Sequence, residues 1–511
     1  MATSQIFVVL AIVIYLAGML LIGVYFNRRG SGNSSSDFYI GGRSLGPIVT
    51  AMSAEASDMS SYLLMGLPGL AYIAGVAEVG WTVIGLTVGT YLNFLLVAKP
   101  LRRYSARLGA FTIPEYFSKR YDDDKHILSM LAALIILIFF IPYTASGFKA
   151  VGALFNSLFG LDYHIAMIIG AVVIISYTVL GGFLAVSTTD LVQSIVMSIA
   201  LVVIVFFGIS QAGGLGTVMS NAKALPGYLD LTKGYIWETG EAGSFGFISI
   251  ISTLAWGLGY FGMPHILLRF MAIRDENELK ISRRIASIWV IISMAIAVFI
   301  GIIGYSVSLT GKIPMLETSS DAETVIMKMA HLMSEHHVIL ALIAGVILAG
   351  ILAATMSTAD SQLLAASSSV SQDLLTDFFG IDLDQKKTMI VARGTVIAIA
   401  LIALILAWNP DSSVFRVVSF AWAGFGATFG PCMLLSLFWR RSNKYGAIAG
   451  MAAGGIMIFV WKFVIAPMGG IFAIYELLPA FIVCLIVNVI VSLVTPEPGN
   501  TITSIYDEVL K

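Results

Sequence analysis

Long apolar runs recur along the whole chain and are separated by short polar segments. A helix needs about 20 mostly apolar residues to cross a hydrocarbon core roughly 30 Å thick, and most of these runs are that long. The pattern predicts about thirteen membrane-spanning helices, at 6–26, 47–74, 79–98, 127–152, 163–183, 189–211, 246–268, 285–308, 338–365, 389–408, 413–438, 445–466 and 471–494. No stretch between them reads as a water-soluble domain, so we expect a single membrane domain over residues 1–511.

Composition supports an all-α polytopic membrane protein. Of the 511 residues, 58% are hydrophobic and only 12% are charged, whereas a soluble domain carries about 25% charged residues. The 29 basic and 30 acidic residues nearly balance, which argues against a nucleic-acid partner. Motifs of the HExxH, GxSxG and P-loop types are missing from the sequence, so an enzyme is not indicated.

Basic residues predict the orientation. Most Lys and Arg residues lie in the loops that follow odd-numbered spans, such as Arg102, Arg103 and Arg107 after the third and Arg269 after the seventh. Because cytoplasmic loops carry the excess of Lys and Arg, we expect the N-terminus outside and the C-terminus in the cytoplasm of a cell-membrane protein. In this assignment no Lys or Arg lies in the middle of a span.

Two spans are interrupted by residues that unwind helices. The second holds Glu55, Asp58 and several serines before a Gly- and Pro-containing stretch at 65–69, and the seventh holds three glycines and a proline within 257–264. Unwound backbone is tolerated at this depth only where it lines a cavity or is buried in protein. The alternative, that the glycines only allow close helix packing, does not explain the two carboxylates.

The two interrupted spans are five apart, so each opens a five-span unit, and an odd repeat length places the units in opposite orientations. Matched breaks in inverted repeats indicate the central site of a secondary transporter. We therefore divide the chain into an extra N-terminal span and loop (1–44), a first repeat (45–211), a second repeat (246–438) and two C-terminal spans with a tail (439–511).

Polar residues inside the spans predict a cation site. Asp58 lies near mid-membrane, where a charge normally has a partner or a function, and a diffusible cation fits this role. In the ninth span Ser357, Asp360 and Ser361 share one helix face, with Thr358 beside it. Hydroxyl and carbonyl oxygens suit Na⁺, although a Ser/Thr cluster can also bond to its own backbone.

Two other acids leave alternatives open. Asp190 opens the sixth span and is either functional or a first-turn acid favoured by the helix dipole. Glu55 either lines the same cavity as Asp58 or pairs with a base on the cytoplasmic side.

At these positions the sequence resembles the sodium/solute symporter family, and within it the bacterial sodium/proline symporters. The motifs that carry the resemblance are GGRSLGP at 41–47, ASDMS at 56–60, MGLPG at 65–69, GGFLAVS at 181–187, WGLGYFG at 256–262, MST at 356–358 and WAGFGA at 422–427.

The resemblance implies a leucine-transporter-type 5+5 inverted repeat with broken helices, and Na⁺ as the coupling ion with no further cofactor. It implies Na⁺ binding by backbone oxygens of Ala56, Met59 and Ala354 and by the hydroxyls of Ser357 and Thr358, with Asp58 needed for sodium coupling. A possible second sodium site falls on Asp190, Ser357, Asp360 and Ser361. The implied substrate residues are Ser60, Ser61, Tyr143, Trp256, Tyr260, Met263 and Pro264.

The sequence departs from the proline carriers at two of these substrate positions. Ser61 replaces a glycine and Met263 replaces a glutamine, and Glu55 adds a carboxylate where those carriers have glycine. From the resemblance as a whole we predict a sodium-coupled symporter that imports L-proline by alternating access, with half-helix N-termini holding the substrate carboxylate. The alternatives are a Na⁺ or H⁺ symporter for another small amino or carboxylic acid, and a membrane sensor built on the same fold.

Overall fold

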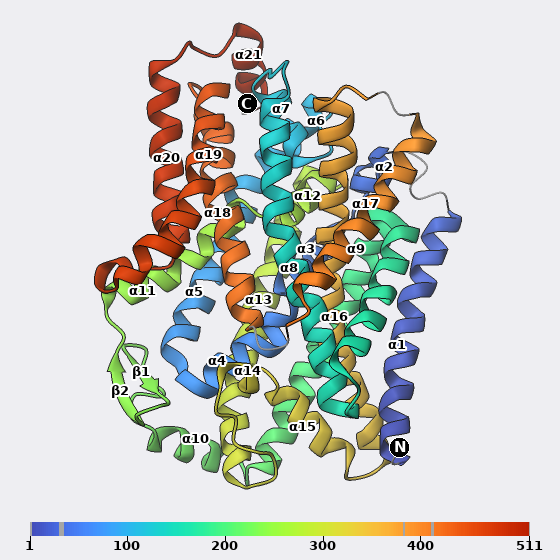
Figure 1. The fold of residues 1–511 in the computed structure, drawn as a ribbon, viewed down its shortest axis with the longest axis vertical. Coiled ribbons are helices and arrows are strands. Elements are labelled where there is room, and N and C mark those ends of the chain that lie inside the picture. The colour runs from blue at the N-terminus through green and yellow to red at the C-terminus, as the bar shows by residue number, and fades with distance from the viewer. Residues whose placement is uncertain (1–2, 30–34, 382–383, 410–412, 510–511) are drawn as a thin grey trace.

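The computed structural model describes residues 3–29, 35–381, 384–409 and 413–509, and these are mainly helical (Figure 1). The α-helices of the first half are α1 Thr3–Arg28, α2 Ser35–Ile40, α3 Pro47–Ser61, α4 Leu67–Ala74, α5 Val76–Leu92, α6 Ala98–Leu108, α7 Ile113–Arg120, α8 Ile127–Phe159, α9 Tyr163–Gln211 and α10 Leu215–Ala224. Those of the second half are α11 Phe247–Leu254, α12 Pro264–Ala272, α13 Leu279–Leu309, α14 Ser319–Ala322, α15 Val325–Ser334, α16 Val338–Ser368, α17 Gln385–Leu406, α18 Val414–Phe438, α19 Lys444–Val460, α20 Leu477–Val494 and α21 Asn500–Val509.

Shorter 3₁₀ and π segments join several of these helices. They are η1 Gly41–Arg43, η2 Tyr62–Gly66, η3 Asn93–Val97, η4 Ala255–Phe261, η5 Glu276–Glu278, η6 Ser369–Phe378, η7 Trp461–Ile465, η8 Ala466–Met468 and η9 Gly470–Phe472. Strands β1 Lys233–Ile236 and β2 Glu241–Ser244 form an antiparallel hairpin.

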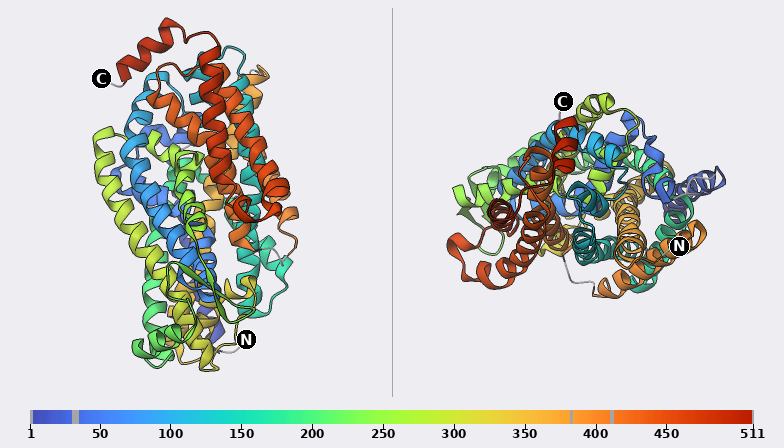
Figure 2. Two further views of the ribbon diagram at one scale, coloured as in Figure 1. Left: turned by 90° about the vertical axis from the view of Figure 1, so that its left-hand side faces the viewer. Right: turned by 90° about the horizontal axis from the view of Figure 1, so that it is seen from above.

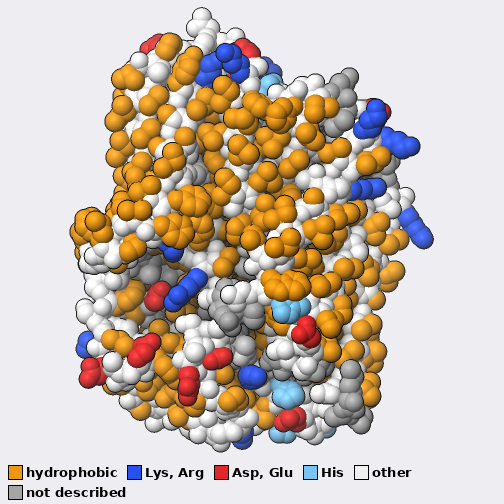
Figure 3. Space-filling view, in the orientation of Figure 1, with side chains coloured by type: hydrophobic (Ala, Val, Ile, Leu, Met, Phe, Trp, Pro, Cys, Tyr) orange, Lys and Arg blue, Asp and Glu red, His pale blue; other side chains and the backbone are white. Residues whose placement is uncertain are grey.

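The helices form a bundle whose two ends differ. α1 begins at the lower end in Figure 1, the end at which α10, α15 and the hairpin also lie, whereas α6, α7 and α21 lie at the upper end. We call these the N-terminal and C-terminal faces. Figure 3 shows hydrophobic side chains over a broad band of the surface, with charged side chains gathered toward the upper edge and in the lower third. A bilayer would cover such a band.

The predicted spans match the helical segments. Within the described residues, ten helices are long and apolar enough to cross a membrane, or eleven if the bent pair Phe247–Phe261 and Pro264–Ala272 is one span. The predicted range 47–74 folds as the interrupted series α3, η2 and α4. The ranges 163–183 and 189–211 both fall in the single element α9.

α9 nevertheless contains two spans, because the chain turns back at Gly182, whose φ is 61°. Tyr163, at the start of α9, lines a pocket together with Pro314 of the segment after α13. At the other end of α9, Gln211 accepts a hydrogen bond from Lys312 in that same segment, at 3.0 Å. Both ends of α9 therefore lie at the N-terminal face, and Gly182 packs against Phe38 of α2 at the opposite face.

α16 is the most enclosed long helix and packs against α1, α3, α8 and α9 (Figures 1 and 2). Small residues allow the close approach. A Cβ at Gly345 would lie 2.6 Å from the Ala11 side chain of α1, and one at Gly350 would lie 2.7 Å from that of Ala200 of α9. The position of α16 fixes one wall of the site described below.

The glycines of the seventh span also serve packing. A Cβ at Gly257 in η4 would lie 2.2 Å from the Gly85 carbonyl oxygen and 3.4 Å from the Gly89 Cα, both in α5. At Gly257 the glycine therefore does allow close helix packing, as the alternative interpretation expected, and it also lies within the interrupted span.

We predict that Gly257→Val lowers the free energy of unfolding by about 1–3 kcal/mol or more, because the added methyl groups must separate η4 from α5. Thermal unfolding of the purified protein in detergent measures the effect. Gly394→Val in α17 is the matched control, since a Cβ there meets no atom within 4 Å among the described residues. Equal loss of stability in both variants would contradict the packing.

Candidate functional site

The first helix break lies at Ser60. Residues Thr50–Ser61 of α3 are all buried, and Ser60 adopts φ 40° and ψ −170° between the helical segments on either side. A non-glycine residue at positive φ is uncommon and persists only where the surrounding structure holds it. The Tyr62 N–H donates to the Met59 carbonyl and to the Ser60 Oγ, the latter at 3.2 Å. The chain thus changes direction inside the protein, near the middle of the span.

The second break joins α11, η4 and α12, which bend by 44°. Met263 is extended, and Pro264 begins α12, where proline costs no backbone hydrogen bond. Both breaks therefore fall in the two spans that the sequence predicted.

A hydrogen bond joins the two broken helices. The Tyr260 hydroxyl of η4 donates to Asp58 Oδ2 of α3 at 2.5 Å. The Tyr143 hydroxyl of α8 lies 3.4 Å from the Asp58 carbonyl oxygen, to which it donates. Asp58 Oδ1 is buried and has no hydrogen-bond partner among the described residues. The carboxylate of Asp58 thus has a hydroxyl partner and one oxygen left over.

Four of the five predicted sodium ligands meet where α3 faces α16. The Ser357 Oγ donates to the Ala56 carbonyl oxygen at 2.7 Å and lies 3.2 Å from that of Ala354. The Thr358 Oγ1 lies 3.3 Å from the same Ala354 oxygen. Of these contacts, Ser357 to Ala56 joins α16 to α3, whereas the bonds of Ser357 and Thr358 to Ala354 lie within α16, as the alternative interpretation of the Ser/Thr cluster expected. The Met59 carbonyl, the fifth predicted ligand, accepts the Tyr62 N–H.

A small cavity of about 10 Å³, roughly the room that one water molecule needs, lies beside this cluster. The predicted substrate residues Ser60, Ser61 and Tyr143 line it, as does Thr358 of the oxygen cluster. Gln362 of α16 also lines it. Sequence reasoning missed Gln362, because one amide at the end of a Ser- and Thr-rich stretch gives no distinct signal.

The other predicted substrate residues lie apart from this cavity lining. Trp256 stacks on Tyr475 with ring centroids 5.3 Å apart and contacts Trp422, Phe415 and Tyr62 in an aromatic cluster. Tyr260 reaches Asp58. Met263 and Pro264 are buried at the second break.

A second buried cluster corrects two expectations. Arg269 is not a loop residue: it lies in α12, its side chain is 1% exposed, and its Nη2 pairs with Asp190 Oδ2 at 3.1 Å. A basic residue inside a span therefore does pair with a carboxylate. Asp190 is not a first-turn acid, because α9 resumes at Gly182, and it also accepts from Ser53 at 2.6 Å.

The residues of the possible second sodium site surround this ion pair. Arg269 Nη2 donates to the Ser361 Oγ at 2.6 Å. Asp360 accepts from the Tyr177 hydroxyl at 2.7 Å and from Ser361 at 3.2 Å. The guanidinium thus supplies one positive charge to two buried carboxylates. Sodium binding here stays a prediction.

Glu55 does not pair with a base among the described residues, which was one of the two alternatives that the sequence left open. It is 1% exposed, and neither carboxyl oxygen has a hydrogen-bond partner among the described residues. It pairs with no base in the described ranges and is not part of the cavity lining.

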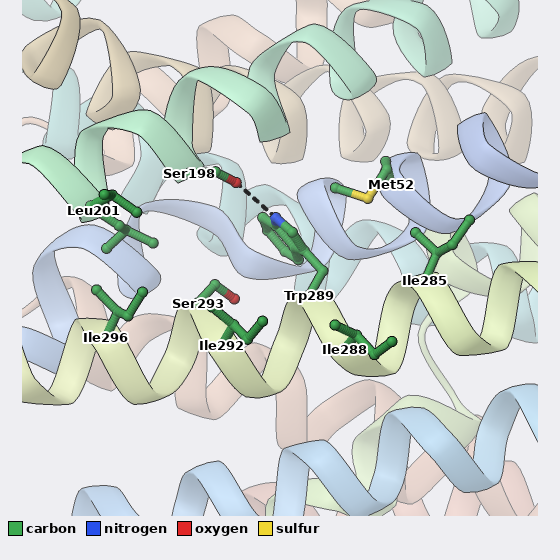
Figure 4. A pocket seen from close by; sticks show the side chains of 10 residues that line it. Met52, Ser198, Leu201, Ile285, Ile288, Trp289, Ile292, Ser293 and Ile296 are labelled. Atoms are coloured by element: carbon green, nitrogen blue, oxygen red, sulfur yellow. Dashed lines mark hydrogen bonds between the residues drawn. The ribbon is translucent and has the colours of Figure 1, made fainter.

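A larger apolar pocket lies between α3, α9 and α13 (Figure 4). Trp289 Nε1 donates to the Ser198 Oγ at 2.9 Å on its wall. Ile288 and Ile292 on its rim are 60% and 54% exposed. This pocket faces the hydrophobic surface of the bundle and lacks the polar groups that would hold an ionic solute.

The broken helices, the buried acids and the oxygen cluster define an ion-coupled secondary transporter. The chain belongs to the sodium:solute symporter family, whose model matches residues 38–454. It is 40% identical over 495 residues to the osmoregulated proline transporter OpuE of Bacillus subtilis (strain 168), covering 96% of each chain. It is also 40% identical to the sodium/proline symporter of Staphylococcus aureus (strain USA300 / TCH1516), over 96% of this chain and 93% of that one.

Solved structures show the same fold. A Na⁺-coupled sialic acid symporter in its substrate-bound outward-open state matches with a TM-score of 0.80 at 20% identity, over 96% of this chain and 99% of the other. The nucleobase-cation-symport-1 family transporter Mhp1 matches with a TM-score of 0.56 at 15% identity, over 93% and 98%. The predicted leucine-transporter-like fold is confirmed. The protein is a multi-pass Na⁺-coupled solute symporter and not an enzyme.

We predict that Arg269→Leu destabilises the protein by about 3–5 kcal/mol, because it leaves the Asp190 carboxylate buried without its ionic partner. Thermal unfolding in detergent measures the loss. Arg269→Leu combined with Asp190→Leu removes both charges and should recover most of the stability. Additive losses in the double variant would contradict a coupled ion pair.

Proposed function

We propose that this protein imports L-proline together with Na⁺. The observation that supports proline as the substrate is the 40% identity to two proline transporters over 96% of the chain. The hydroxyl and amide groups of Ser60, Ser61, Tyr143 and Gln362 beside the helix break suit a small polar substrate. Another small amino acid is the second candidate, favoured by Ser61 on the cavity wall.

The oxygen cluster between α3 and α16 is the proposed sodium site. The Ser357 hydroxyl contacts the backbone oxygens of Ala56 and Ala354, and the Thr358 hydroxyl contacts that of Ala354. A sodium ion would lie among these oxygens, with the hydroxyls of Ser357 and Thr358 still protonated and rotated so that an oxygen lone pair of each faces the ion. Hard cations prefer such oxygen ligands, and the Met59 carbonyl would join when Tyr62 releases it.

Sodium binding in this position would couple to the substrate through two features. Thr358 belongs to both the oxygen cluster and the cavity wall. Asp58 lies between Ala56 and Met59 and bonds to Tyr260 of the other broken helix. An ion bound beside Asp58 would therefore hold α3 against α16 and set the position of η4.

The direction of transport follows from the proposed orientation. Arg102, Arg103 and Arg107 of α6 lie at the C-terminal face, where Arg107 pairs with Glu508 at 3.1 Å. This face would be cytoplasmic by the excess of basic residues. A membrane potential of about 100 mV, negative inside, would then drive each positive charge inward with roughly 2.3 kcal/mol.

We predict that proteoliposomes containing the protein accumulate radiolabelled L-proline only under an inward Na⁺ gradient. Asp58→Asn keeps the size of the side chain and removes its charge, so it should raise the Na⁺ concentration for half-maximal uptake by about tenfold or more. A rate of proline uptake that is the same with and without the Na⁺ gradient would contradict sodium coupling. Uptake of another amino acid but not proline would contradict the substrate.

We also predict that Ser357→Ala weakens Na⁺ binding, because the hydroxyl contributes to the site and the small alanine keeps the helix packing. The half-saturating Na⁺ concentration should rise severalfold to tenfold, as expected for one lost ligand of a cation. Ser367→Ala in the same helix is the control, since its hydroxyl bonds to the Ala392 carbonyl at 2.7 Å, away from the break. An unchanged Na⁺ dependence in Ser357→Ala would remove this residue from the proposed site.

A further inference from the structure

Two buried hydrogen-bond donors in the cavity wall have no partner among the described residues. Ser61 Oγ and Gln362 Nε2 both lack a hydrogen bond within the described part of the chain, and each residue is 1% exposed. They come from different elements, the segment after the break in α3 and the continuous helix α16, yet line the same space. A buried donor without a partner costs about 1–3 kcal/mol, so these groups call for a ligand.

The orientation of the Gln362 amide is fixed. The Thr144 hydroxyl of α8 donates to Gln362 Oε1 at 3.0 Å. This bond uses the acceptor end of the amide and leaves the two N–H groups of Nε2 available. Gln362 is therefore held as a donor.

The other hydroxyls around the cavity are already engaged with the backbone. Ser146 donates to the Tyr143 carbonyl at 2.6 Å, Thr355 to that of Ile351 at 3.0 Å, and Thr358 to that of Ala354 at 3.3 Å. The amide that follows the helix break is also used, since the Tyr62 N–H donates to Ser60. The Tyr62 amide is thus not free for the substrate, whereas side-chain donors remain on the cavity wall.

We propose that Gln362 and Ser61 bind the carboxylate of the transported amino acid, with Thr144 as the positioning residue for the Gln362 amide. This inference rests on the proposed transport of proline and adds the group that recognises its anionic end. An acceptor with two oxygens matches donors on two sides of a small cavity. No Lys or Arg lines the cavity among the described residues, so neutral donors take this role, next to the proposed sodium ion.

The test compares two inhibitors of radiolabelled L-proline uptake in proteoliposomes. Pyrrolidine has the ring and amine of proline without its carboxylate, so it should inhibit the wild type far more weakly than unlabelled L-proline. In Gln362→Ala, proline should lose about ten- to hundredfold in apparent affinity, as for a lost hydrogen bond to a charged group. The apparent affinity for pyrrolidine should be nearly unchanged, so the ratio of the apparent affinities for proline and pyrrolidine becomes smaller.

Three further variants sharpen the result. Gln362→Glu places a like charge against the carboxylate and should abolish proline binding. Thr144→Val removes the orienting hydroxyl and should give a smaller loss than Gln362→Ala, again for proline and not for pyrrolidine. Gln193→Ala is the matched control, because this buried glutamine of α9 donates to Tyr15 at 3.2 Å and does not line the cavity.

If a variant does not transport, equilibrium binding of the same two compounds to the purified protein replaces uptake. If the ratio of the affinities for proline and pyrrolidine is unchanged in Gln362→Ala while the wild type transports proline normally, this inference alone is overturned. Ser61 and Gln362 would then bind water and not the substrate. A wild type that fails to take up proline would instead overturn the proposed function.

Discussion

A helix that stops inside a membrane leaves backbone groups without intrahelical partners, and lipid offers none. In α3 this happens at Ser60, and neighbouring side chains meet the need: Ser357 donates to the Ala56 carbonyl and Tyr143 to that of Asp58. The groups that satisfy the broken backbone are thus the groups proposed to bind ion and substrate. The break requires the close approach of α16 and α8, and that approach creates the cavity between them.

Buried charge is distributed unevenly around this break. On the side toward the C-terminal face, Asp190 has the Arg269 guanidinium as a fixed cation. Among the residues that the structure describes, the Asp58 carboxylate, nearer the break, has the Tyr260 hydroxyl as its hydrogen-bond partner and one oxygen without a partner. Asp190 is neutralised by a cationic side chain of the protein, whereas Asp58 has no such side chain among the described residues and can be neutralised by a cation from solution. This contrast supports Asp58, rather than Asp190, as the acid that responds to Na⁺.

Much of this arrangement could be predicted from the sequence. Hydropathy located the spans, and the glycines, prolines and acids of the second and seventh spans located both breaks. The turn at Gly182 also agrees with two spans, although α9 is one continuous element. The family resemblance implied a sodium site at residues that the fold brings together, such as Ala56 and Ser357.

The features that the sequence did not predict depend on contacts between segments that are distant in the chain. Arg269 ends an apolar run and was counted with loop residues, since only the fold shows that Asp190, 79 residues away, reaches it. Gln362 gave no signal in the sequence because its proposed role depends on a hydrogen bond from Thr144, 218 residues away, which orients its amide. The amphipathic α21 and the β1–β2 hairpin lie outside the membrane pattern, so hydropathy did not predict them.

The central claim is that one sodium ion and one substrate share the wall formed by α3 and α16. Equilibrium titration of L-proline into the purified protein tests this directly, in NaCl and in choline chloride at equal ionic strength. The account predicts that Na⁺ raises the affinity for proline by about tenfold or more, and that proline raises the affinity for Na⁺ by the same factor, because linkage is reciprocal. Equal proline affinity in both salts would contradict it.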